Sequence, residues 1–167
     1  MKIVTTPMCE DILKIAGLTD YEVVEVAQLV NADIAIVLSE TKTQLDTIRI
    51  KLNTYQQIIE SVTRVSEEFN TEVDEDEIGK IQVLINENNN KKDKRKNTKV
   101  KVYSNFLSET VKDMGYTICD DNYDYIVIPD FMKEDIDDEN TIIIPSHSNV
   151  TKSIIERLKE RYELLEI

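Results

Sequence analysis

Short apolar runs that end in polar residues alternate along this chain with longer segments of helical periodicity. A nearly all-apolar run such as 34–38 is typical of a parallel strand that is covered on both faces. The predicted strands are residues 3–5, 21–26, 34–38, 100–103, 117–119, 125–128 and 141–144. The pattern predicts an α/β fold in which two βαβ-type units form a mainly parallel sheet with helices on both faces.

The longest stretch of helical spacing lies between these two strand-rich segments. It predicts helices over about 43–69 and 77–87, which together form an inserted helical hairpin, 43–87. Such a hairpin suits either covering the sheet or pairing with a second copy, and we predict a homodimer. Residues 88–99 are polar and basic, which predicts a flexible loop, with a mobile phosphate-binding arm as the alternative.

The two strand-rich segments resemble each other. The stretch 3–6 can be placed opposite 102–105, Cys9 opposite Ser108, and 31–37 opposite 122–128. Either an internal repeat or the sequence pattern that all βαβ units share would give this likeness. The length of 167 residues predicts a single domain, 1–167, with a cleft lined by polar strand ends.

The charge balance narrows the possible partners. The chain has 20 basic and 33 acidic residues, a net charge of −13, which disfavours nonspecific binding to DNA, RNA or an anionic membrane. A nucleotide needs only a local pocket and stays possible. Two cysteines, no secretory leader and no run near the roughly 20 apolar residues of a membrane span predict a soluble cytoplasmic protein.

A cysteine occupies the turn that follows the first predicted strand. Cys9 stands where a helix is predicted to begin, so backbone N–H groups and the helix dipole would favour its thiolate, the nucleophilic form. The acidic neighbours Glu10 and Asp11 work against thiolate formation. The alternative is that Cys9 is a small packing residue, as free cysteines often are.

Other strand ends supply candidate ligand-binding groups, since hydroxyls and backbone N–H groups there could hold a nucleotide or a carboxylate. These candidates are Thr5, Thr6, Pro7, Met8, Ser39, Asp130, Ser146 and His147. Asp130 suits recognition of guanine or ribose, or is a turn residue. His147 could form a dyad with Cys9, or be a hydrogen-bonded loop residue.

Several common motifs are missing from the sequence. It has no GxGxxG, GxxxxGK[ST], CxxC or HExxH motif, so we predict no metal site and no required cofactor.

The stretch Lys2-Ile3-Val4-Thr5-Thr6-Pro7-Met8-Cys9-Glu10, with the chain's length and acidity, resembles the HcgF family. That family acts in biosynthesis of the iron-guanylylpyridinol (FeGP) cofactor of [Fe]-hydrogenase in methanogens. The resemblance implies that guanylylpyridinol is the ligand and that a partner enzyme activates its carboxylate with ATP by adenylylation. It further implies that Cys9 takes the acyl group as a thioester, a transferase-like step.

Two other functions fit the residues. One is a noncovalent binding module for a nucleotide or small anion, and the other is a Cys-His hydrolase or transferase that uses Cys9 and His147.

Overall fold

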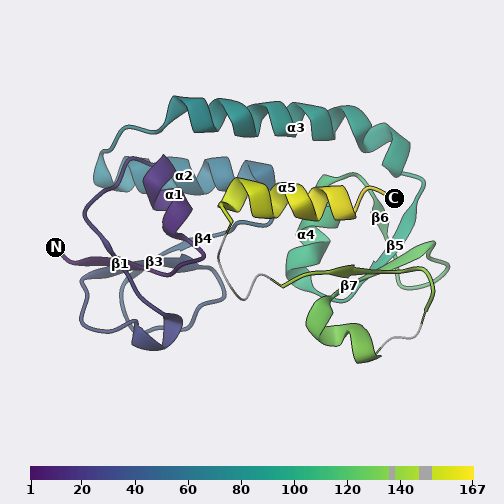
Figure 1. Ribbon diagram of the computed structural model, residues 1–167, viewed down its shortest axis with the longest axis horizontal. Coiled ribbons are helices and arrows are strands. Elements are labelled where there is room, and N and C mark those ends of the chain that lie inside the picture. The colour runs from purple at the N-terminus through teal and green to yellow at the C-terminus, as the bar shows by residue number, and fades with distance from the viewer. Residues whose placement is uncertain (136–137, 147–151) are drawn as a thin grey trace. The chain divides into compact units, whose positions relative to one another are not determined.

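The computed structural model describes residues 1–135, 138–146 and 152–167 (Figure 1). In place of the single domain predicted over 1–167, the chain divides into two compact units, Met1–Gln82 and Val83–Ile167. Each unit has its own four-stranded parallel sheet. No helix in these described residues is long and apolar enough to cross a membrane.

The first unit contains a parallel sheet in the order β2-β1-β3-β4. Its elements are β1 (Ile3–Thr5), α1 (Glu10–Ile15), β2 (Glu22–Val23), the 3-10 helix η1 (Val26–Gln28), β3 (Ile34–Leu38), β4 (Thr47–Ile50) and α2 (Tyr55–Phe69). In register, Val4 of β1 pairs with Ala35 of β3, and Ile36 pairs with Ile48 of β4. Because all strands are parallel, their carboxyl ends share one edge of the sheet.

The long helix α3 (Glu75–Arg95) begins in the first unit and ends in the second. The second unit has a parallel sheet in the order β6-β5-β7-β8. Its further elements are β5 (Lys99–Val102), α4 (Asn105–Asp113), β6 (Thr117–Ile118), β7 (Tyr125–Pro129), η2 (Asp130–Asp135), β8 (Thr141–Ile144) and α5 (Ile154–Leu164).

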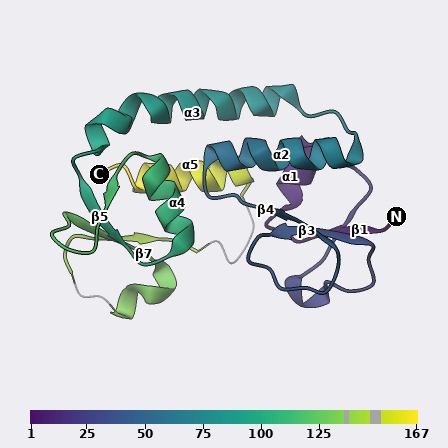
Figure 2. The same cartoon turned by 180° about the vertical axis from the view of Figure 1, so that it is seen from behind.

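Helical segments flank both faces of each sheet (Figures 1 and 2). In the first unit, α1 and α2 lie on one face and η1 on the other. In the second unit, α4 and α5 lie on one face and η2 on the other. The predicted parallel α/β class is therefore confirmed, with two separate sheets where one was expected.

The two units are structural repeats of each other. They have the same strand order, and each has an asparagine with positive φ before its third strand, Asn31 at 55° and Asn122 at 56°. Two residues later, Asp33 accepts a backbone N–H bond from Lys2, just before β1, and Asp124 accepts one from Lys99, the first residue of β5. The predicted correspondence of 31–37 with 122–128 is confirmed.

The predicted correspondence of the first strands was wrong by two residues. Asp33 donates its backbone N–H to the Lys2 carbonyl, and Asp124 donates to the Lys99 carbonyl, so Lys2 corresponds to Lys99. Ile3 therefore corresponds to Val100, and the stretch 3–6 is not opposite 102–105.

The helical hairpin differs from the prediction at both ends. Residues 47–50 form strand β4, and α2 begins only after Thr54, whose Oγ1 accepts the Gln57 N–H at 3.1 Å. At the other end, α3 continues to Arg95, so the loop predicted over 88–99 is wrong up to that residue. The homodimer stays a prediction.

Candidate functional site

The turn after β1 is held by internal hydrogen bonds. Thr5 and Thr6 are buried, and Thr5 Oγ1 donates to the Ile36 carbonyl at 2.7 Å, which ties β1 to β3. The Thr6 carbonyl accepts the Cys9 N–H at 3.0 Å and closes the turn around the half-buried Pro7 and Met8. These bonds give both threonines a structural role.

Cys9 lies where the sequence predicts, at the carboxyl edge of the sheet and directly before a helix. It is the N-cap residue of α1, and its side chain makes no capping hydrogen bond. Its exposed fraction is 0%. An outside reagent would therefore reach the sulfur only after neighbouring side chains move.

The structural repeat also shows which residue of the second unit corresponds to Cys9. Gly17 and Gly115 end the equivalent helices α1 and α4 with the same pattern of backbone hydrogen bonds. Counting back from these glycines places Cys9 opposite Leu107, and not opposite Ser108 as predicted. Leu107 is fully buried, so the equivalent position of the second unit is a core position.

A cavity of about 370 Å³ opens in the first unit beside the carboxyl ends of β3 and β4. We call it the β4–α2 pocket. Its lining residues are Ser39, Arg49, Ile50, Lys51, Gln57, Glu60, Ser61 and Arg64. Ser39 was predicted to bind a ligand and does lie in this lining.

Backbone carbonyls fix two of the cationic side chains in the pocket. Arg49 Nη1 donates to the Ser39 carbonyl at 3.1 Å and to the Thr41 carbonyl at 2.5 Å. Arg64 Nη1 in turn donates to the Arg49 carbonyl at 2.7 Å. Within the described residues, neither guanidinium forms an ion pair with a carboxylate.

Sequence reasoning missed the cationic lining because it placed residues 43–69 in one helix. The available signal was the alternation of Thr47, Ile48, Arg49 and Ile50, in which the two isoleucines are buried. A period of two residues is typical of a strand and places Arg49 on the face opposite Ile48 and Ile50.

The other predicted ligand residues lie in the second unit. Ser146 donates its backbone N–H to Asp130 Oδ2 at 3.0 Å, so the structure brings these two strand ends together. That bond supports the turn-residue interpretation of Asp130. His147 lies outside the described residues, as does any dyad that it would form with Cys9.

The second unit contains a half-buried cation, Arg161, that sequence analysis did not single out. Arg161 Nε and Nη1 are buried and have no hydrogen-bond partner in the described part of the chain. The guanidinium carbon lies 5.2 Å from the centre of the Phe106 ring. Burial, with a smaller contribution from the charge of Arg157 and against an opposing one from Tyr162, lowers the pKa of Arg161 to about 10. Counted from the N-caps Thr54 and Ser153, the equivalent residue of α2 is the buried Val62.

Replacing this half-buried cation by an apolar side chain is expected to stabilise the protein. Arg161→Met should raise the free energy of unfolding by about 1 kcal/mol at pH 7, since the desolvation cost disappears. The folded-state pKa lies below the unfolded one, so the cost is complete below about pH 10 and fades above it. Urea unfolding at pH 7 and pH 10.5 measures both effects.

Arg64→Met, at an exposed position with the same change in charge, is the control for Arg161→Met. A loss of 1 kcal/mol or more in Arg161→Met alone would mean that packing against Phe106 outweighs desolvation.

Comparison with known protein families gives a match in the second unit. Residues 96–166 match the MJ0786 family C-terminal domain. The matched residues all lie within the second unit, Val83–Ile167. No curated protein matches the chain.

Solved structures resemble the whole chain. The laminin-binding protein Lbp of Streptococcus pyogenes has a TM-score of 0.64 at 13% identity, covering 99% of this chain and 97% of that one. The adhesin Lmb of Streptococcus agalactiae gives 0.63 at 12%, covering 99% and 100%. AdcAII of Streptococcus pneumoniae gives 0.61 at 12%, covering 99% and 97%. At these identities the likeness shows the fold alone.

Lmb is described as a bifunctional protein with adhesin and metal transporting activity. In this chain, residues 1–135, 138–146 and 152–167 contain no group of three or more histidine, cysteine, aspartate or glutamate side chains that could hold a metal ion.

Proposed function

We propose that the chain binds guanylylpyridinol and holds its activated carboxylate as a thioester on Cys9 during FeGP cofactor biosynthesis. The observation that carries the proposal is the position of Cys9, at the carboxyl edge of a parallel sheet and at the start of a helix. Ligands of open α/β sheets bind at that edge. The resemblance of the first residues to the HcgF family supplies the ligand, and the MJ0786 match is consistent with an HcgF-like family.

The chemistry needs little from the protein beyond a placed thiol. A partner enzyme joins the ligand carboxylate to AMP with release of pyrophosphate. The Cys9 sulfur then attacks the acyl carbon, a C–S bond forms, and the C–O bond to AMP breaks. AMP leaves with that oxygen, and the thiol proton passes to solvent. Because AMP is a good leaving group, no general acid is required, and a nearby backbone N–H would stabilise the oxyanion.

The burial of Cys9 adds a step before this attack. A fully buried sulfur has to be uncovered, and the turn with Pro7 and Met8 is the segment that directly precedes it. We propose that ligand binding opens this turn. The thioester would then form only in the presence of the ligand. Until the ligand binds, burial would protect the thiol from other acyl donors. Neither Cys9 nor Cys119 forms a disulfide, and a persistent thiol suits a reducing cytoplasm.

Intact-protein mass spectrometry tests the thioester. The protein is incubated with guanylylpyridinol, ATP and the adenylylating enzyme, and we expect a mass gain equal to guanylylpyridinol minus water. Cys9→Ser should show no such gain, because a serine hydroxyl is a much weaker nucleophile. Neutral hydroxylamine should remove the adduct from the native protein.

Cys119→Ser is the matched control, since Cys119 is the second thiol and is more exposed than Cys9. It should keep the adduct in full. An equal adduct on Cys9→Ser, or none on the native protein, would overturn the proposal. Unchanged guanylylpyridinol affinity in Cys9→Ala, with no adduct on the native protein, would instead establish a noncovalent binding module.

A further inference from the structure

We propose that the β4–α2 pocket binds the phosphate group of a small phosphate ester, about the size of a mononucleotide. Arg49, Lys51 and Arg64 are the groups that would hold the phosphate. Cys9 is not among the residues that line the pocket. The proposal therefore does not depend on a thioester.

The charge of the pocket opposes the charge of the chain. Three cationic side chains and the single carboxylate of Glu60 line the cavity, whereas the whole chain has a net charge of −13. In such an acidic protein, carboxylates are abundant partners for arginine. Yet among the described residues neither Arg49 nor Arg64 is paired with one. Their positive charge is thus available to an anion from outside.

The two arginines are held in place without using their full hydrogen-bonding capacity. In the described part of the chain, the hydrogen bonds that Arg49 and Arg64 donate all use Nη1 and go to backbone carbonyls. A guanidinium has five N–H donors in a planar fork, which matches two phosphate oxygens at once. Anchoring by carbonyls reduces the entropy that a ligand would otherwise have to overcome on ordering these side chains.

The size and remaining lining favour an ester over a large polyanion. A cavity of about 370 Å³ is near the lower end of the roughly 300–1,000 Å³ typical of small-molecule sites. Ser39, Gln57 and Ser61 add polar side chains, and the Glu60 carboxylate can accept hydrogen bonds from ligand hydroxyl or amino groups. The negative field of the whole chain disfavours nucleic acid.

Isothermal titration with GMP, inorganic phosphate and guanosine tests the proposal. We expect GMP to bind the native protein and guanosine to bind at least about tenfold more weakly. Arg64→Gln should weaken GMP binding by about tenfold or more, and Arg64→Lys by less, because lysine keeps the charge but loses the fork. Arg64 is exposed on α2, so its replacement leaves the core intact.

Lys2→Gln is the matched control, since Lys2 lies at the amino end of β1 and its loss changes the net charge equally. It should leave GMP affinity within about twofold, as expected for a remote exposed charge. Inorganic phosphate binding as tightly as GMP would support the phosphate site and identify free phosphate as its ligand.

Three results would overturn the pocket proposal: no binding of GMP or phosphate, equal binding of guanosine and GMP, or unchanged GMP affinity in Arg64→Gln. Cys9→Ser should bind GMP normally. Failure of the thioester at Cys9 is therefore distinguishable from failure of the phosphate site.

Discussion

Gly17→Ala is expected to lower the free energy of unfolding by about 3 kcal/mol or more, the largest effect expected at any of the three glycines. Gly17 has φ of +81°, which costs an L-residue about 1–2 kcal/mol. A Cβ there would also lie 2.1 Å from the Glu72 carbonyl oxygen, a backbone atom that cannot rotate away. Urea unfolding of the native and variant proteins measures the loss.

The close approach at Gly17 has a structural reason. The carbonyls at the end of α1 accept hydrogen bonds from the connection between α2 and α3, where Asp74 N–H donates to Ile15 at 2.8 Å and Thr71 Oγ1 donates to Ala16. These bonds satisfy carbonyls that a helix end leaves without partners, and they draw residue 72 onto the glycine.

The other two glycines are matched controls. Gly79 lies within α3 with open space around a built Cβ, so Gly79→Ala should stabilise by about 0.5–1 kcal/mol. Gly115→Ala should destabilise less than Gly17→Ala, by about 2 kcal/mol, because φ is +95° and the nearest Lys92 atoms lie at 3.0 Å. Equal stability of the Gly17 and Gly79 variants would contradict the geometry.

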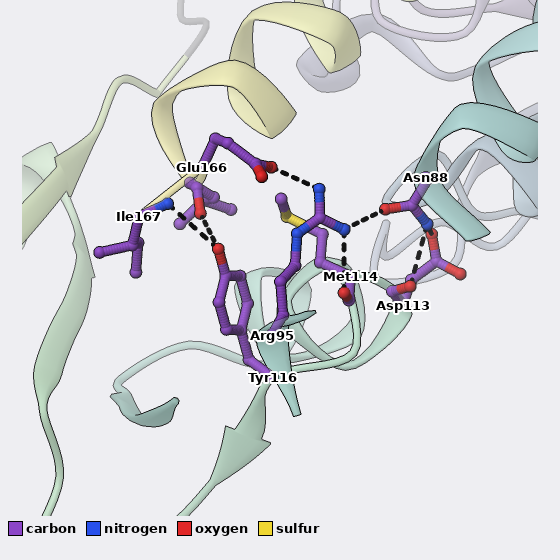
Figure 3. Close-up of polar contacts among 8 residues, drawn as sticks. Asn88, Arg95, Asp113, Met114, Tyr116, Glu166 and Ile167 are labelled. Carbon is purple, nitrogen blue, oxygen red and sulfur yellow. Dashed lines mark hydrogen bonds and ion pairs between the residues drawn. The ribbon is translucent and has the colours of Figure 1, made fainter. Parts of the chain in front are cut away.

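Arg95→Met is expected to destabilise the protein by about 3 kcal/mol, because buried acceptors lose their donor. Figure 3 shows Arg95 reaching three parts of the second unit. Nη1 donates to Asn88 Oδ1 at 2.8 Å and to the Met114 carbonyl at 2.9 Å, and Nη2 pairs with Glu166. Arg95 is 5% exposed, so water cannot replace these bonds in the folded state.

Glu166→Gln separates the ion pair from the rest of this cluster. Glu166 is 45% exposed, so loss of its charge should cost about 1 kcal/mol or less. Chemical unfolding of the two single variants and the double variant gives their coupling energy. A loss below 1 kcal/mol in Arg95→Met would show that the hydrogen bonds to Asn88 and Met114 contribute little.

The parts of the fold that could be predicted have strong local patterns. The apolar runs at 34–38 and 125–128 were placed correctly as strands. Strand β4 was missed because Ile48 and Leu52 also fit helical spacing with the residues that follow. A period of two residues over only four positions is a weaker signal than the longer helical pattern.

The polar end of α3 could not be predicted for a different reason. Asn88 and Arg95 look like solvated loop residues in the sequence, yet both are buried, where they bond each other and the carboxyl end of α4. Partners distant in sequence satisfy these groups, and no local pattern reports them.

Only part of the candidate site could be predicted from the sequence. The position of Cys9 at a strand end and helix start followed from local signals, whereas its complete burial depends on packing by the rest of the unit. Likewise Ser39 was found as a strand end, but Arg49 and Arg64 come together only because β4 precedes α2.

Helix α3 has a consequence for how the protein unfolds. The boundary between the units, at Gln82 and Val83, falls inside this helix, so no loop separates them. Helix formation is cooperative, and disrupting hydrogen bonds at a helix centre costs more than fraying its ends. Loss of structure in one unit therefore shortens a helix on which the other unit also depends, and the two structural repeats are linked in stability by the backbone itself.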